Sequence, residues 1–320
     1  MKSLRGRCLF YLLIMICICI AVLTAGCQYK YGTNPDKENK MSIVTTIFPI
    51  ADIIRNIGGD YVHVTCLLPP GADPHTFEPT VAQVKAMART DLFVYIGNGL
   101  DDWSLKLSAA ADRDLSIVRL SENMELAASP SSPHDHNCKE SNNIYCTHGN
   151  NPHIWLDPVM VRDHIIMVIT RELSRSCPQG KTCFAENSNA YRTELTKLDK
   201  EINDRLFSLE NRSFISCHSA WAYFAARYGL EEAAVISEHP GQEPSPRWIA
   251  ELVDLTEALG ISTIFAESQL NPALAESIAA EIDGRVLLLD PLGGEGLPGR
   301  GSYLELMRHN TAIMAEGLKE

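Results

Sequence analysis

The sequence lacks the short motifs that mark many nucleotide-binding and hydrolytic proteins. It contains no G-x-x-x-x-G-K-[ST] loop, no G-x-G-x-x-G after the first expected strand and no G-x-S-x-G turn. The zinc-protease motif H-E-x-x-H is also absent. A nucleotide-dependent enzyme, a serine hydrolase and a zinc protease of that type therefore have no support from their usual signatures.

Basic residues are scarce as well, with 28 Lys+Arg against 40 Asp+Glu. Removal of residues 1–27, which hold three basic and no acidic side chains, would change these counts to 25 and 40, a formal charge of −15. Proteins that bind nucleic acid take most of their affinity from a basic face, so this charge balance argues against that class. An acidic chain suits a protein that handles cations, although acidity alone is usually just a solvated surface.

The amino terminus has the order of a secretory signal. Basic residues come first, an apolar run follows over 9–25, and Gly-Cys comes next. We expect a lipoprotein-type signal peptide over 1–26 and acylation of Cys27, with a polar tether over 27–41. The alternative is an uncleaved anchor, because 17 apolar residues lie near the lower limit for a membrane span. Both readings place the rest of the chain outside the cytoplasm.

Short apolar runs rich in β-branched residues alternate with helical patterns from Ser42 onward, which predicts parallel sheets covered by helices. We expect an α/β protein of two lobes, 42–181 and 212–320, each with a sheet of about four strands. A stretch without Gly or Pro predicts one long helix over 182–211 that joins the lobes. The expected strands are 42–49, 61–69, 91–97, 115–120, 213–217, 233–237, 262–266 and 285–290.

Six cysteines besides Cys27 would remain after such processing. In an oxidising compartment, Cys138 with Cys146 and Cys177 with Cys183 are candidate local disulfides, on proximity alone. The other two, Cys66 and Cys217, could pair with each other or stay as buried apolar groups.

Four polar residues follow predicted strands or close the long loop 129–152, and ligands of parallel α/β sheets bind beyond the carboxyl ends of strands. They are His75, His153, His218 and Asp290. Three imidazoles and one carboxylate suit Zn²⁺. The spacing is no zinc-finger signature, and each histidine taken alone is better explained as a hydrogen-bonded surface or core residue.

Five motifs in order resemble the metal-binding (zinc and manganese) solute-binding lipoproteins of bacterial ABC importers, the cluster A-I type. They are GADPHTFEP, NPHIWLDP, HSAWAYFAARYGL, EPSPRWIAEL and LDPLGG, and the resemblance runs from about Ser42 to the C-terminus. It implies two α/β lobes joined by a rigid helix, with the metal in the cleft between them. It also implies that the four residues above are the ligands and that the protein is not an enzyme.

The resemblance further implies capture of zinc outside the cytoplasm and delivery to a cognate permease and its ATPase. Manganese binders of this group commonly have Glu where this chain has His218, which favours zinc over manganese or iron(II). We expect a lipid-anchored monomer on the periplasmic side or the cell surface. A secreted zinc-dependent hydrolase is the rival from another class.

Two further groups of residues lie near these motifs. Glu78, Asp157 and Glu267 are candidates to orient the ligand imidazoles. The loop histidines His134, His136 and His148 are candidates for a weak secondary metal site, and a polar loop without any metal is an equally good interpretation.

Overall fold

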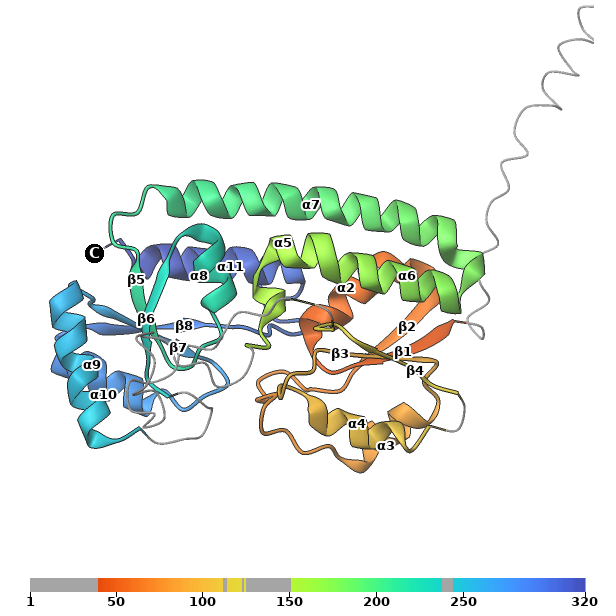
Figure 1. Ribbon diagram of the computed structural model, residues 1–320, viewed down its shortest axis with the longest axis horizontal. Helices are drawn as coiled ribbons and strands as arrows, with labels where there is room; N and C mark the ends of the chain where they lie inside the picture. The colour runs from red at the N-terminus through yellow and green to blue at the C-terminus, as the bar shows by residue number, and fades with distance from the viewer. Residues whose placement is uncertain (1–39, 112–113, 123, 125–150, 238–243, 320) are drawn as a thin grey trace, which may run out of the picture. The chain divides into compact units, whose positions relative to one another are not determined.

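Eight parallel strands form two four-stranded sheets in the computed structural model, which describes residues 40–111, 114–122, 124, 151–237 and 244–319 (Figure 1). The expected signal peptide, Cys27 and nearly all of the tether lie outside the described residues. So does most of the loop 129–152, including His134, His136, Cys138, Cys146 and His148.

The two sheets repeat one topology. The first has the order β2-β1-β3-β4 and the second the order β6-β5-β7-β8, and every neighbouring pair is parallel. All eight strands overlap the runs expected from the sequence, so the predicted fold class is confirmed. Their bounds are β1 Met41–Thr45, β2 Val62–Cys66, β3 Leu92–Tyr95, β4 Ser116–Arg119, β5 Ser213–Ser216, β6 Glu231–Val235, β7 Thr263–Glu267 and β8 Arg285–Leu289.

Helices cover the sheets, as parallel strands require. Those of the first lobe are α2 Phe48–Gly58, α3 Val81–Ala88, α4 Leu105–Ser108, α5 Pro158–Met160 and α6 Ile166–Ser176. Those of the second lobe are α8 Ala222–Tyr228, α9 Pro246–Leu259, α10 Ala273–Glu281 and α11 Tyr303–Gly317. Within the described ranges, none of the helices combines the length and the apolar character needed to cross a bilayer.

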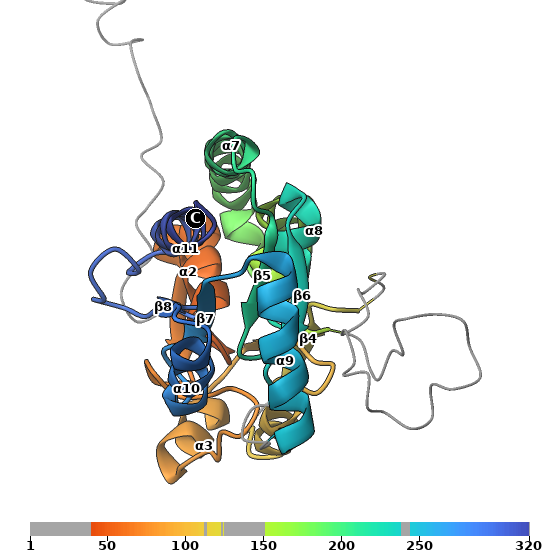
Figure 2. The same cartoon turned by 90° about the vertical axis from the view of Figure 1, so that its left-hand side faces the viewer.

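The long helix α7, Lys181–Phe207, connects the lobes and has 27 residues, which corresponds to about 40 Å. It packs against α2 and α11, which lie side by side beneath it in Figure 2. The helix ends four residues before the expected bound. Arg212 caps this end, because its guanidinium donates to the carbonyls of Leu206 and Phe207 in the last turn.

One hydrophobic core crosses from lobe to lobe along α7. It includes Ile50 of α2, Leu195 of α7 and Tyr303 of α11, all fully or almost fully buried. A polar contact reinforces it, because the Asp52 carboxylate of the first lobe accepts a hydrogen bond of 2.9 Å from the backbone N–H of Tyr303. This N–H belongs to the first turn of α11, so one lobe satisfies a helix terminus of the other. The exact lobe boundaries, 42–181 and 212–320, stay predictions.

The four described cysteines are all free thiols, so the expected disulfide between Cys177 and Cys183 is not formed. Cys177 is buried directly after α6, whereas Cys183 lies in the first turn of α7 with its Sγ 3.4 Å from Asn187. Cys66 and Cys217 are not paired either. Burial raises the pKa of Cys66 to about 11 and that of Cys217 to about 12, so both stay protonated and unreactive.

Candidate metal centre

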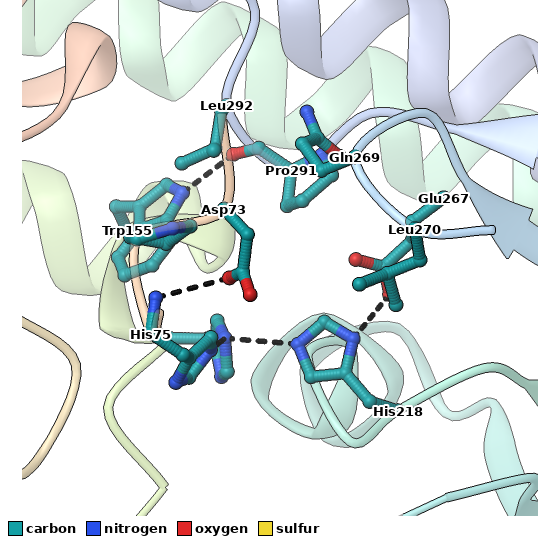
Figure 3. A pocket seen from close by; sticks show the side chains of 11 residues that line it. Asp73, His75, Trp155, His218, Glu267, Gln269, Leu270, Pro291 and Leu292 are labelled. Carbon is teal, nitrogen blue, oxygen red and sulfur yellow. Dashed lines mark hydrogen bonds and ion pairs between the residues drawn. The ribbon is translucent and has the colours of Figure 1, made fainter. Parts of the chain in front are cut away.

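Three histidines from separate segments meet at the carboxyl ends of the strands. His75 lies in the loop after β2, His218 follows β5, and His153 precedes the short turn Ile154–Leu156. One ring nitrogen from each of them lies within 4.8 Å of the other two. Asp73 and Trp155 also line the small cavity beside them, whose volume of about 10 Å³ is the size that a single water or ion needs (Figure 3).

The nitrogen atoms are spaced as zinc ligands are. The Nε2 atom of His153 lies 3.3 Å from Nε2 of His75 and 3.3 Å from Nε2 of His218. Tetrahedral Zn²⁺ with Zn–N bonds of about 2.05 Å requires ligand atoms about 3.3 Å apart. Two of the three pairs of imidazoles therefore already have the separation that one zinc ion would impose, and the third pair lies within 4.8 Å.

In two of the rings, the nitrogen that faces away from the cluster, Nδ1, lies close to an oxygen atom. Nδ1 of His153 lies 2.9 Å from Oδ1 of Asn151, and Nδ1 of His218 lies 2.7 Å from Oε1 of Glu267. With the ring proton at Nδ1, the lone pair of each neutral imidazole is on Nε2 and faces the cluster. Figure 3 shows His218 between Glu267 and the other imidazoles. Glu267 therefore lies against His218, and its orienting role stays a prediction.

Asn151 performs the same task for His153, and the sequence analysis missed it. Its Oδ1 also accepts from the backbone N–H of His153 at 3.0 Å, and its Nδ2 donates to the carbonyl of Ser219. The signal was present, because an Asn two residues before a ligand readily forms such a local turn. Asn151 links the segments that carry His153 and His218.

The pKa values of two of these rings are shifted in opposite directions. Burial, with His218 and His75 nearby, holds the pKa of His153 well below its usual value. Burial also acts to lower the pKa of His218, but the Glu267 carboxylate outweighs it and the net pKa is raised. Behind His218, burial raises the pKa of Glu232 to about 7, and its carboxyl accepts from the hydroxyls of Ser216 and Ser219.

The loop that carries His75 is fixed by hydrogen bonds as well as by its prolines. The indole Nε1 of Trp103 donates to the carbonyl of Pro74 at 2.8 Å, and the Trp103 and Phe77 rings pack 5.0 Å apart. Asp73 accepts from the backbone N–H of His75 at 3.0 Å and from the Thr76 hydroxyl at 2.8 Å. Trp103 is therefore a positioning residue that the sequence did not reveal.

The fourth expected ligand, Asp290, does not join the three histidines in this structure. Its side chain is buried after β8, and Oδ2 accepts from Nη1 of Arg300 at 2.7 Å. Its neighbour Pro291 lines the cavity instead, and the Pro291 carbonyl accepts from the Trp155 indole at 2.7 Å. Asp290 as a ligand stays a prediction.

Two other expected residues lie away from the cluster. Asp157 receives three hydrogen bonds from the guanidinium of Arg227 and caps α5 through the N–H groups of Val159 and Met160, so its role is structural. Glu78 is exposed and does not line the cavity. Of the three acids expected to orient the imidazoles, only Glu267 contacts one of the three histidines.

The family model described as "Zinc-uptake complex component A periplasmic" matches residues 43–317. Among curated proteins, the chain is 27% identical to the high-affinity zinc uptake system protein ZnuA of Bacillus subtilis over 312 residues, which cover 96% of this chain and 97% of that protein. It is 28% identical to the manganese-binding lipoprotein MntA of Halalkalibacterium halodurans over 308 residues, 94% of this chain and 96% of that protein.

A third relative is longer. The chain is 29% identical to the zinc-binding protein AdcA of Streptococcus pyogenes over 288 residues, 87% of this chain, and spans only 56% of the length of AdcA. Two solved structures share the fold. A crystal structure of ZnuA has a TM-score of 0.74 at 30% identity and covers 87% of this chain and 99% of its own. The laminin-binding protein Lmb of Streptococcus agalactiae has a TM-score of 0.73 at 30% identity and covers 87% and 100%.

The hydrogen bond from Trp103 should matter for metal affinity. We expect Trp103→Phe, which keeps a packed ring but loses the donor to Pro74, to weaken zinc binding about 3- to 10-fold, the effect of one hydrogen bond. Trp248→Phe is the matched control, because its indole also donates to backbone carbonyls, those of Val235 and Ile236. Competition titration with a zinc-binding dye measures both. Equal zinc affinity in the two variants would show that Trp103 does not position His75.

The contact between His218 and Glu267 predicts a specific pH profile. Zinc must displace any proton on Nε2 of His218, and the raised pKa makes affinity fall as the pH drops through that pKa. In Glu267→Gln, burial dominates and the pKa falls, so the acid loss of affinity should shift to lower pH. At pH 8 the variant should bind zinc about 10-fold more weakly, because the ring is less well oriented. Titrations from pH 5 to 8 test this, and an unshifted midpoint would contradict it.

Proposed function

Because this chain belongs to the zinc-uptake component A family of periplasmic binding proteins, we propose that it captures zinc outside the cytoplasm and delivers it to an ABC-type importer. The observation that carries the proposal is the convergence of three buried or half-buried Nε2 atoms, two of the separations being 3.3 Å. We infer that His75, His153 and His218 bind the ion directly. Asp290 would supply a fourth ligand only after it leaves Arg300.

The cavity fits a protein that only binds a metal ion better than it fits an enzyme. A three-histidine zinc with a bound water is also the ligand set of some hydrolases, which need space for a substrate and a general base. Here the cavity of about 10 Å³ has no room for an organic substrate. Of the two acids that line the cavity, Glu267 is paired with His218, and Asp73 accepts hydrogen bonds from the His75 N–H and the Thr76 hydroxyl. These two observations favour a binding protein over a zinc-dependent hydrolase.

The ligand atoms favour zinc as the cargo. Three neutral imidazoles suit the borderline Zn²⁺, whereas Mn²⁺ is harder and takes oxygen ligands. The relatives include both a zinc uptake protein and a manganese-binding lipoprotein, so their names alone do not decide between the two metals. The nitrogen-rich cluster of this chain is the reason to propose zinc, with manganese or iron(II) as the alternative.

The delivery route follows from the expected N-terminal lipid anchor. Acylation of Cys27 would hold the protein at the outer side of a membrane, close to a permease, and some relatives are named lipoproteins. We propose that a monomer exchanges zinc with that permease, whose ATPase drives transport.

The proposal predicts one zinc ion per chain in purified protein. His153→Ala should reduce zinc affinity by at least about 100-fold, because the central ring of the cluster is lost. His63→Ala is the control, since His63 lies exposed on β2 and outside the cluster. Elemental analysis and competition titration give the stoichiometry and affinity. Zinc binding that survives His153→Ala intact would exclude this site.

Replacement of His218 by a carboxylate should change the metal preference. His218→Glu exchanges a nitrogen ligand for oxygen, so we expect weaker zinc binding and stronger manganese binding relative to wild type. Calorimetry with each metal measures the ratio of the two affinities. An unchanged ratio would mean that this ligand does not select the metal.

A further inference from the structure

We propose that Arg300 sets the metal specificity of this site by competing with the bound cation for the carboxylate of Asp290. The idea depends on the proposed role in metal capture and concerns the order of preference among metals. Its basis is the ion pair between Nη1 of Arg300 and Oδ2 of Asp290, which is 2.7 Å long. Gln269 and Pro291, the neighbours of Asp290, line the cavity beside the three histidines.

Asp290 lies next to two residues that line the cavity. Gln269 and Pro291 line the cavity, whereas Asp290 does not. The Nε2 group of Gln269 donates to Oδ1 of Asp290 at 2.8 Å, and Pro291 directly follows it in the chain. The carboxylate is therefore a near neighbour of the bound ion whose access to the ion depends on its present partners.

Only one oxygen of Asp290 can change partner at low cost. Oδ1 accepts three hydrogen bonds, from Gln269 and from the backbone N–H groups of Leu292 and Gly293 at 3.0 and 2.9 Å. These bonds form the turn after β8, so Oδ1 is committed to the fold. Oδ2 has Arg300 as its one hydrogen-bond donor among the described residues. A cation that recruits Asp290 must therefore displace this guanidinium.

The loop that carries Arg300 holds the guanidinium in place. The backbone N–H of Arg300 donates to the Leu297 carbonyl at 3.1 Å, and its carbonyl accepts from Gly294 at 3.2 Å. Gly293 has φ +61°, and a Cβ there would lie 2.8 Å from the Arg300 carbonyl oxygen, so the turn requires glycine. The Asp290 side chain is only 3% exposed and that of Arg300 27%, so water screens the pair weakly.

Displacement of Arg300 affects hard and borderline cations differently. Zn²⁺ can be held by three imidazoles and one water, so it does not need to break the pair. Mn²⁺ prefers oxygen ligands, and it gains the carboxylate only by separating two opposite charges, one of them buried. Arg300 therefore disfavours manganese more than it disfavours zinc.

Arg300→Gln tests the inference, with Arg308→Gln as a matched control. Arg308 also pairs with an acid, Glu201, but on the exposed contact between α11 and α7. In metal titrations with Zn²⁺ and Mn²⁺, we expect Arg300→Gln to raise manganese affinity relative to zinc by about 10-fold, an effect typical of residues that contact a metal ligand. Arg308→Gln should leave the ratio as it is in wild type, and Arg300→Lys should largely restore it.

The double variant Arg300→Gln with Asp290→Asn distinguishes two explanations of a changed metal preference. One is that the Asp290 carboxylate becomes available to the metal, and the other is that the site loses a nearby positive charge. If Asp290 is the group that Arg300 withholds, the increase in the manganese-to-zinc ratio disappears in this background. An increase that persists there, or an equal increase in Arg308→Gln, overturns the inference. The inference is also overturned if the wild-type protein binds zinc but Arg300→Gln has the same manganese-to-zinc affinity ratio as wild type. If the wild-type protein binds neither metal, the proposed function itself is wrong.

A crystal structure of the zinc-loaded wild-type protein needs no variant and decides the same question. We expect Oδ2 of Asp290 to remain paired with Arg300 while zinc is bound by the three histidines. Asp290 on the zinc ion, with Arg300 turned away, would refute a restraining role of Arg300.

Discussion

Three imidazole rings can converge on one point only if other residues fix the orientation of each ring, because neutral rings stabilise one another little before a metal binds. Glu267 holds His218, Asn151 holds His153, and Trp103 fixes the backbone before His75. These partners come from β7, from the segment before His153 and from the region after β3, so the site depends on the correct formation of both sheets. The fold thus prepares the geometry of a zinc site in advance, which reduces the entropy lost on binding.

The charged groups around the three histidines influence which metal the site prefers. Glu267 and Asp290 are both buried acids close to the cluster, yet each is matched by a partner, one by His218 and the other by Arg300. A site with two unmatched carboxylates would be a harder, more anionic site that suits manganese. The same ligand residues can therefore serve different metals in related proteins, depending on which acids remain paired.

The strands could be predicted from their own local pattern, whereas the three histidines were found through their positions beyond strand ends or at the close of a long loop, together with the five family motifs. β-branched runs bounded by turn residues mark buried parallel strands, and polar residues at their carboxyl ends mark a site. The partner of Asp290 could not be predicted, since Arg300 reaches it through a turn whose shape depends on Gly293. Asn151 and Trp103 act through hydrogen bonds that no periodicity reveals. Cys177 and Cys183 are free thiols in the structure, and closeness in sequence alone does not give two cysteines the geometry of a disulfide.

The shared core along α7 has a consequence for how a bound ion leaves. Ile50, Leu195 and Tyr303 pack into one cluster, and Asp52 caps a helix of the other lobe, so separating the lobes would break apolar packing and a hydrogen bond together. We therefore expect a bound ion to leave by a local movement of the loop that carries His75 rather than by a hinge between the lobes.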